Sequence, residues 1–315
     1  MRKKTRLLAV LFLLIPLAMT FAGGTSAKSG ASKLRTFAVI YPVIHPVFEP
    51  VNEGAQEKAK EMGVNVEFHG PDVADPAQQI QIVENLIAKR VDGIAIGPTD
   101  SAALTPLINR AIERGIKVLC FDTDAPQSNR AGYIGTINLN FGRHMGEVLG
   151  QTLNGKGNVL VSQGVATQQN LIERLQGVKE VCSQKYPDIK FIDEQSGAGD
   201  PNRTLANIEN MVKAHPDFDA LIGIDAAAGP AAAIVWKAQG LKQPVIVGDD
   251  TADIIQGVKD GYITYTIAQN QYVWGQKIVE ELNDLCDGKS IPESFDAGTR
   301  AVDGKNVWTT AQYNK

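Results

Sequence analysis

Apolar and polar positions follow two recurring patterns from residue 36 onward. Short runs rich in β-branched residues alternate with segments whose apolar residues recur at helical spacing; in 76–89, Ile80, Val83, Leu86 and Ile87 fall on one face. The runs predict strands at Thr36–Tyr41, Val64–His69, Gly93–Ile96, Lys117–Phe121, Ala131–Ile134, Asn158–Ser162, Lys190–Asp193, Ala220–Ile224, Val245–Val247 and Thr264–Ala268. This alternation predicts parallel sheets with helices on both faces.

The number of predicted strands bears on the number of sheets. Ten strands are more than one compact sheet of this kind holds, and the pattern nearly restarts after Asn138. We therefore expect an α/β fold with two doubly wound parallel-sheet lobes. Because no Gly/Ser/Pro-rich linker separates the halves, we expect short structured crossings between the lobes.

The N-terminal segment has the pattern of a secretory signal peptide. Basic residues from Arg2 to Arg6 precede an apolar run, Leu7–Ala22, and small residues follow. The alternative is a membrane anchor, but the run is short for a span and contains Pro16. We expect cleavage after Ala27, which leaves 288 of the 315 residues as an exported, periplasmic chain.

Charge and composition exclude two classes of function. The formal net charge is −4, and no lysine- or arginine-rich patch follows the N-terminal segment, which argues against nucleic-acid binding. The cysteines and histidines show no metal-ligand spacing, so no metal site is expected. Cys120 ends an apolar run and is expected to be a buried thiol, while a Cys182–Cys286 disulfide stays open.

Polar side chains gather immediately after the predicted strands. In doubly wound sheets ligands bind outside the carboxyl ends of the strands, so these loops are the candidate site. They hold carboxylates, amides and aromatic rings, which suit a polyhydroxylated ligand. Asp72, Asp75 and Asp200 are expected to cap helices instead. For Asp122, Asp225 and Asp250, capping and ligand contact both stay open.

Signatures of enzymes are missing from the sequence. There is no G-x-S-x-G nucleophile elbow, no phosphate-binding loop and no complete dinucleotide fingerprint. Paired carboxylates leave a glycosidase as a minority alternative. We expect a protein without a cofactor that performs no chemistry on its ligand.

Several motifs, in their order and spacing, resemble one family along nearly the whole expected mature chain. These motifs are Pro46–Phe48 with Asn52–Ala55, Asp92–Asp100, Phe121–Ala125, Tyr133–Thr136, Val247–Asp250 and Thr266–Gln269. They resemble the pentose/hexose-binding family of bacterial periplasmic proteins, the ribose-binding-protein-like solute receptors of ABC importers. The resemblance implies a type I periplasmic binding protein with three hinge strands, near Gly135–Asn138, Ala268–Asn270 and Gly298–Ala301. The implied lobes are residues 36–136 with 270–298, and residues 137–269 with 299–315.

The resemblance also implies a set of ligand contacts. They fall on Tyr41, His45, Phe48, Asp122, Thr123, Asp124, Asn170, Asp225, Asp250 and Gln269, with Asp124 opposite Asn170 across the cleft. The ribose binder has an asparagine, an arginine and an asparagine at the positions of His45, Thr123 and Asp225. Its second-lobe arginine and aromatic residue fall on Ile172 and Gly199. Arg174, one turn below Asn170, can supply a guanidinium to the site or form a salt bridge on the helix surface, and the salt bridge is the expected role.

The expected function is capture of a neutral pentose or hexose for a membrane ABC permease by a monomeric receptor. The permease would touch the helix faces near Pro46–Met62 and Ala166–Lys185. The alternative is a sensory receptor that presents a polyol or an autoinducer-like furanosyl signal to a chemoreceptor or sensor kinase. A transcription-repressor core with the same lobes is rejected, because a signal peptide stands where its helix-turn-helix would be.

Overall fold

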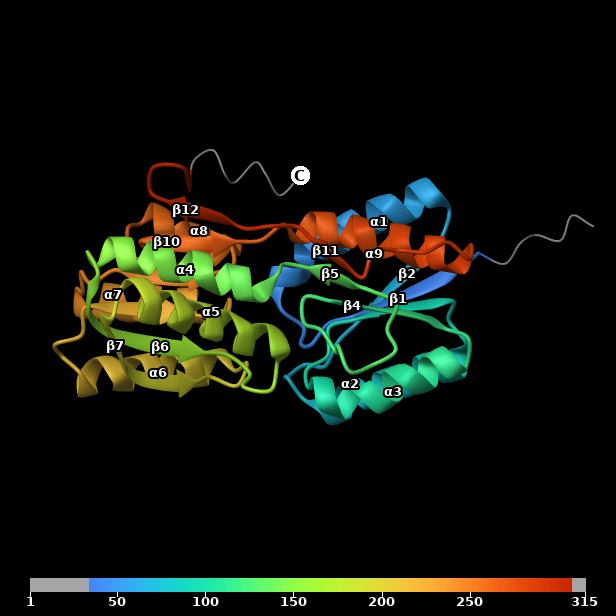
Figure 1. The fold of residues 1–315 in the computed structure, drawn as a ribbon, viewed down its shortest axis with the longest axis horizontal. Coiled ribbons are helices and arrows are strands. Elements are labelled where there is room, and N and C mark those ends of the chain that lie inside the picture. The colour runs from blue at the N-terminus through green and yellow to red at the C-terminus, as the bar shows by residue number, and fades with distance from the viewer. Residues whose placement is uncertain (1–33, 308–315) are drawn as a thin grey trace, which may run out of the picture. The chain divides into compact units, whose positions relative to one another are not determined.

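The strands form two six-stranded sheets (Figure 1). The computed structural model describes residues 34–307, so the expected signal peptide and residues 308–315 lie outside the described residues. Sheet A has the order β11-β5-β4-β3-β1-β2 and sheet B the order β12-β10-β9-β8-β6-β7. The strands of sheet A are β1 (Thr36–Ile40), β2 (Asn65–His69), β3 (Gly93–Ile96), β4 (Lys117–Phe121), β5 (Tyr133–Gly135) and β11 (Ser294–Asp296). Those of sheet B are β6 (Lys156–Gln163), β7 (Asp188–Ser196), β8 (Ala220–Gly223), β9 (Val245–Gly248), β10 (Tyr265–Ala268) and β12 (Arg300–Asp303).

Sheet A and its helices form lobe 1. Alternate residues of β1 point to opposite faces: Phe37 and Val39 meet one apolar cluster, Ala38 and Ile40 the other. The first cluster contains α1 (Glu49–Met62) and α9 (Gln271–Cys286), which pack side by side, and the second α2 (Pro76–Lys89) and α3 (Ser101–Glu113). The 3-10 helix η1 (Pro46–Phe48) leads into α1. Because both faces are covered, the inner strands β1, β3 and β4 read as nearly continuous apolar runs.

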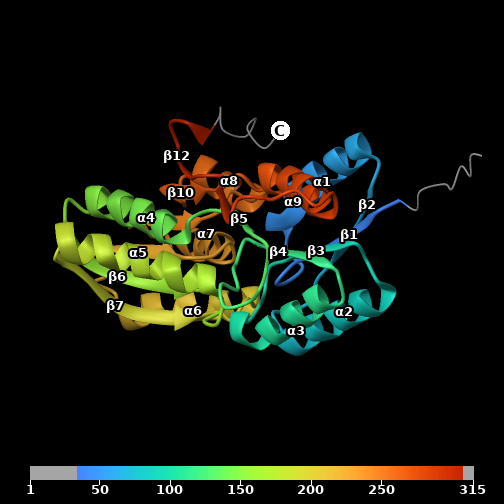
Figure 2. The same ribbon diagram turned by 45° about the vertical axis from the view of Figure 1, so that its right-hand side comes forward.

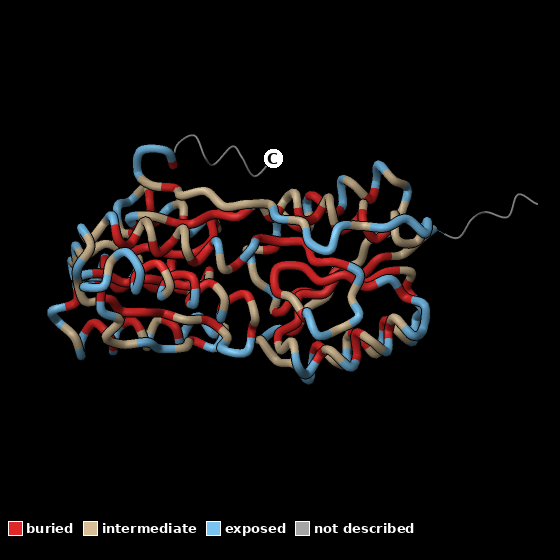
Figure 3. The backbone as a smooth tube through the Cα atoms, viewed as in Figure 1, coloured by how far each residue is buried: buried red, intermediate tan, exposed pale blue. Residues whose placement is uncertain are grey.

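Sheet B and its helices form lobe 2 in the same way. The helices α4 (Asn138–Thr152) and α5 (Gln169–Lys185) cover one face. The other face packs on α6 (Pro201–Ala214), α7 (Ala228–Gln239) and α8 (Ala252–Lys259). Figure 2 shows the same arrangement from a second direction, and Figure 3 shows that the buried backbone runs along the strands.

The two lobes repeat one plan. Strands β1 to β5 of sheet A occupy the same places as β6 to β10 of sheet B, in that order, and β11 corresponds to β12. All pairings are parallel except β10 with β12. The chain passes between the sheets at residues 136–137, 269–270 and 297–299. The expected α/β fold with two doubly wound lobes and three crossings is confirmed.

The edge strands and the cysteines can be compared with what the sequence predicted. The edge strands β11 and β12 were not among the ten predicted strands, because three or four residues of mixed polarity give no apolar run. The three cysteines are free, and Cys120 is a fully buried thiol as expected. Within residues 34–307 no helix is both long and apolar enough to span a bilayer.

Candidate functional site

A cavity lies between the lobes, where loops from the carboxyl ends of both sheets meet. Residues of both lobes line this cavity. Its polar lining comes from His45, Asp122, Gln168, Asn170, Arg174, Asp225, Asp249, Gln269 and Trp274. Apolar lining comes from Pro42, Val43, Val47, Phe48, Val165, Leu171, Gly199, Ala226 and Ala227.

Asp122 and Asp249 occupy equivalent places in the two lobes. Asp122 follows β4 and Asp249 follows β9, and both have left-handed backbones, with φ of 60° and 69°. Their N–H groups donate to equivalent carbonyls, Ile134 at 3.1 Å and Ile267 at 2.8 Å. Asp249 was missed as a site residue; its place after β9 was a usable signal, since Asp122 held that place after β4.

Burial changes the protonation of two cavity carboxyls. Desolvation raises the pKa of Asp122 to about 7, although Arg174 opposes the shift. Desolvation, assisted by the negative charge of Asp249, raises the pKa of Asp225 to about 6. A group that donates hydrogen bonds to these carboxyls would stabilise their charged forms.

Arg174 points into the cavity, which corrects the expectation of a salt bridge on the helix surface. It shares the inward face of α5 with Asn170 and Leu171, and its side chain is only 2% exposed. The guanidinium lies 4.2 Å over the Phe141 ring, and Nε donates to Asn138 Oδ1 at 2.9 Å. A charged residue can thus belong to the inward face of a helix when a cavity and an aromatic ring receive it.

The guanidinium faces two carboxylates without touching them. Nη1 lies 3.8 Å from Asp249 Oδ2, and Nη2 lies 4.0 Å from Asp122 Oδ1. Both separations exceed a hydrogen bond. The guanidinium and both carboxylates therefore keep hydrogen-bonding capacity for a ligand beside them.

Four buried polar atoms around the cavity have no hydrogen-bond partner. Two are donors, Arg174 Nη2 and Trp274 Nε1, and two are acceptors, Asp225 Oδ1 and Gln269 Oε1. Gln269 uses its other end, since Nε2 donates to Asp249 Oδ1 at 2.6 Å. Unpaired buried polar groups are costly, so this set is built for a ligand that both accepts and donates. Trp274 was not singled out in the sequence analysis; it lies on the buried face of α9 with Ile278 and Leu282.

Aromatic rings and His45 form the lobe 1 side of the cavity. Phe48 lines it, and Tyr41 stacks behind Phe48 with ring centres 4.6 Å apart and donates its hydroxyl to Asn52. Tyr41 therefore supports the wall and does not line the cavity. His45 Nδ1 accepts from the N–H of Val47 at 3.2 Å and caps η1, while burial lowers the pKa of the ring.

Three further expected contacts lie outside the cavity lining. Thr123 is fully buried, and its hydroxyl accepts from the N–H of Asn170 at 3.5 Å. Asp124 is paired with Arg130 and lines a separate hollow with Asn170. Asp250 is paired with Arg300, with Oδ2 and Nη2 2.7 Å apart. Of the aspartates expected to cap helices, Asp75 and Asp200 accept bonds from the first turns of α2 and α6.

Direct hydrogen bonds between the lobes at the cleft are long. Asn170 Nδ2 donates to Asp122 Oδ1 at 3.3 Å, and Thr167 Oγ1 donates to the carbonyl of Thr99 at 3.3 Å. Neither bond is short enough to add much to stability.

Among residues 34–307 no three His, Cys, Asp or Glu side chains are grouped to hold a metal ion.

Comparison with known proteins identifies the family of the chain. The family model described as periplasmic binding protein domain matches residues 37–290. The chain belongs to this periplasmic binding protein family. The resemblance seen in the sequence is thereby confirmed.

Named relatives of this periplasmic binding protein include sugar binders. The D-ribose/D-allose-binding protein of Pseudomonas aeruginosa is 33% identical over 215 residues, 65% of this chain and 67% of its own length. The ribose import binding protein RbsB of Bacillus subtilis is 26% identical over 223 residues, covering 71% and 72%. A solved ABC transporter solute binding protein from Burkholderia graminis, in complex with D-arabinose, is 34% identical with a TM-score of 0.83, covering 89% of this chain and 98% of that one.

Proposed function

We propose that this protein is an extracytoplasmic receptor that captures a neutral pentose or hexose between its lobes and delivers it to an ABC importer. The observation that carries the proposal is the set of four unpartnered atoms at the cavity. A sugar hydroxyl donates and accepts at once, so neighbouring hydroxyls can satisfy Asp225 and Gln269 as donors and Arg174 and Trp274 as acceptors.

The charge of the cavity supports a neutral ligand over an anionic one. Three carboxyls, those of Asp122, Asp225 and Asp249, face one guanidinium, that of Arg174. A sugar phosphate or uronic acid would add negative charge to an acidic, buried site. Phe48 and Trp274 offer ring surface for the apolar side of a sugar. Relatives named for ribose, allose and arabinose support a pentose or hexose.

The direct ligand contacts in this proposal are Asp122, Arg174, Asp225, Asp249, Gln269 and Trp274, with His45, Phe48 and Asn170 closing the walls. Tyr41 supports the ring of Phe48. Thr123 and Asp124 hold the turn that carries Asp122. Asp250 acts within its own lobe.

Closure in this proposal moves two bodies about the three crossings. They are residues 36–136 with 270–298 and residues 137–269 with 299–315. The long bonds between the lobes support a closed form that depends on ligand, because a sugar would bridge the carboxylates of one lobe to those of the other. The closed pair of lobes would present α1 and α5 to the permease, after export and cleavage at Ala27.

The test is a binding screen on the chain from Lys28 onward. Thermal shift and calorimetry against D-ribose, D-allose, D-arabinose, D-xylose, xylitol, ribose 5-phosphate and galacturonic acid should give at least one neutral hit, recovered chemically unchanged. A hundredfold excess over the dissociation constant stabilises the fold by about 2.7 kcal/mol. Tighter binding of an anionic sugar, or consumption of the ligand, would contradict the proposal.

A further inference from the structure

Arg300 lies where the third crossing enters lobe 2. It is the first residue of β12 and pairs in register with Ala268 at the end of β10. From there its guanidinium reaches two partners near the cavity: Nη2 donates to Asp250 Oδ2 at 2.7 Å and Nη1 donates to the carbonyl of Gln269 at 3.3 Å. One side chain thus links the hinge to the two loops that carry Asp249 and Gln269.

Both of these partners of Arg300 adjoin Asp249. Asp250 follows Asp249 in the chain, so fixing Asp250 constrains the left-handed turn that aims Asp249 at the cavity. Gln269 donates to Asp249 Oδ1 through Nε2, and Arg300 bonds the carbonyl of that same glutamine. The carboxylate of Asp249 is therefore linked to Arg300 through its own backbone and through Gln269, one of its two side-chain donors, the other being Gln271.

Burial makes this link stronger than a surface ion pair. The Asp250 side chain is 6% exposed and that of Arg300 is 30% exposed. A nearly buried carboxylate that loses its cation is strongly destabilised and tends to turn toward water or take up a proton. Either change would move the turn that begins at Asp249.

The third crossing is also tied to the first. Asp296 Oδ1 accepts from the N–H of Ile137 at 3.1 Å and from the N–H of Gly298 at 2.9 Å. Arg300 follows this segment after two residues. Hydrogen bonds therefore connect the crossings, through Arg300, to the Asp249 turn.

We propose that Arg300 is a positioning residue for ligand binding, which acts through Asp250 and Gln269 to orient Asp249 and makes that orientation depend on the hinge. The inference rests on the proposed sugar-binding function. Arg300 does not line the cavity, so its effect on affinity is indirect and passes through Asp249.

The experiment is a double-mutant cycle of Arg300→Gln with Asp249→Asn, read by calorimetric titration with D-ribose and D-arabinose. Arg300→Gln alone should raise the dissociation constant by about tenfold or more, because a charged hydrogen bond and its alignment are lost. In the Asp249→Asn background the same change should cost less than about threefold, since the target of the positioning is already gone.

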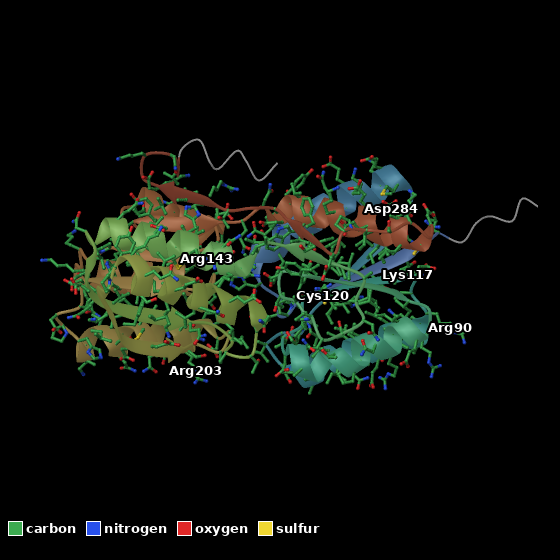
Figure 4. All side chains as sticks on the ribbon, in the orientation of Figure 1. Arg90, Lys117, Cys120, Arg143, Arg203 and Asp284 are labelled. Carbon is green, nitrogen blue, oxygen red and sulfur yellow. The ribbon has the colours of Figure 1, made fainter. Side chains whose placement is uncertain are left out.

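Two further variants separate positioning from stability. Arg300→Lys should recover part of the affinity, because lysine places a charge at Asp250 but does not reproduce the fork. Arg143→Gln is the matched control: Arg143 lies on α4 (Figure 4), pairs with Glu180 at 3.0 Å, and has no bond to the cavity. The control should leave affinity unchanged.

Three results would overturn the inference. One is a lower melting temperature for Arg300→Gln with unchanged affinity, and another is an equal loss of affinity with and without the Asp249 change. Binding of no tested sugar by the unmodified chain would overturn the proposed function itself, and the inference would fall with it. If the unmodified chain binds a sugar, either of the first two results contradicts the role of Arg300 and leaves the proposed function standing.

Discussion

The backbones of Asp122 and Asp249 lie in the left-handed region, and this local geometry aims both carboxylates at one space. Such a conformation costs a non-glycine residue about 1–3 kcal/mol, although aspartate tolerates it better than most. The surrounding sheet hydrogen bonds hold it in both lobes. At the residue scale, the site is therefore made by backbone geometry as much as by side-chain type.

Trp274 tests the role of the unpartnered donors. Trp274→Phe keeps an aromatic ring but removes Nε1–H, so sugar affinity should fall about tenfold while the unliganded protein keeps its melting temperature. The control is Trp236→Phe, which removes an indole donor that bonds the Gln243 carbonyl at 2.7 Å in lobe 2. That variant should lower stability by about 1 kcal/mol without changing affinity. A loss of sugar affinity in Trp236→Phe but not in Trp274→Phe would exclude Trp274 as a ligand contact.

The raised carboxyl pKa values predict a dependence on pH. Between pH 7 and pH 5 the folded, unliganded protein holds protons on Asp122 and Asp225, with pKa values of about 7 and about 6, that an unfolded chain has released. These groups therefore increase the free energy of unfolding as pH falls through this window. Their contribution is lost as pH rises above 7.

Ligand binding should reverse this protonation. Sugar hydroxyls that donate to the carboxylates favour the charged forms, so binding at pH 6 should release protons and affinity should rise from pH 5.5 to 7.5. Calorimetry at pH 6 in buffers of different ionisation enthalpy measures the released protons directly. Proton uptake on binding would contradict the assignment of Asp122 and Asp225 as acceptors.

Pairs of helices in each lobe approach closely enough to exclude a side chain between them. In lobe 2, a Cβ on Gly142 of α4 would lie 1.9 Å from the carbonyl oxygen of Arg174 on α5. In lobe 1, a Cβ on Gly54 of α1 would lie 2.1 Å from the carbonyl oxygen of Tyr272 on α9. At the element scale, the α4–α5 contact differs from the α1–α9 contact in one respect: α5 carries the guanidinium that faces the cavity, that of Arg174.

Alanine at these two glycines should therefore have different effects. Both substitutions force helices apart and should cost about 1–3 kcal/mol of stability. Gly142→Ala should also raise the dissociation constant about tenfold, because it displaces the backbone of Arg174 from its carboxylates. Titration of both folded variants with the same sugar makes the comparison. Equal affinities would show that the position of α5 is not limiting.

At the scale of the whole molecule, the lobes meet through long hydrogen bonds and an ion pair that a ligand can complete. A closed form stabilised mainly by ligand contacts opens when the ligand leaves. We expect small-angle scattering to show a smaller radius of gyration with sugar than without it. An unchanged radius at saturating ligand would contradict hinge closure.

The sequence was sufficient for the fold because each lobe repeats apolar strands and amphipathic helices in one order. The site was predicted in part, since loop positions after strands identify Asp122, Asp225 and Gln269. Whether Asp249 or Asp250 faces the cavity depends on a backbone angle, which residue type does not reveal. Arg174 was expected at the helix surface because a charged helical residue ordinarily faces water, and the sequence analysis did not single out Trp274.

The three crossings have a consequence for the order in which the molecule folds. Lobe 1 buries Trp274, Ile278 and Leu282 of α9 against strands made from the beginning of the chain, yet α9 follows nearly all of lobe 2 in synthesis. Until α9 is available, only α1 covers this face of sheet A, and the apolar residues that α9 would bury stay exposed to water. Lobe 2, almost continuous in sequence, can assemble first, and lobe 1 only after contacts between the most distant parts of the chain. The completion of lobe 1 therefore depends on the last third of the chain, although most of its strands come from the first third.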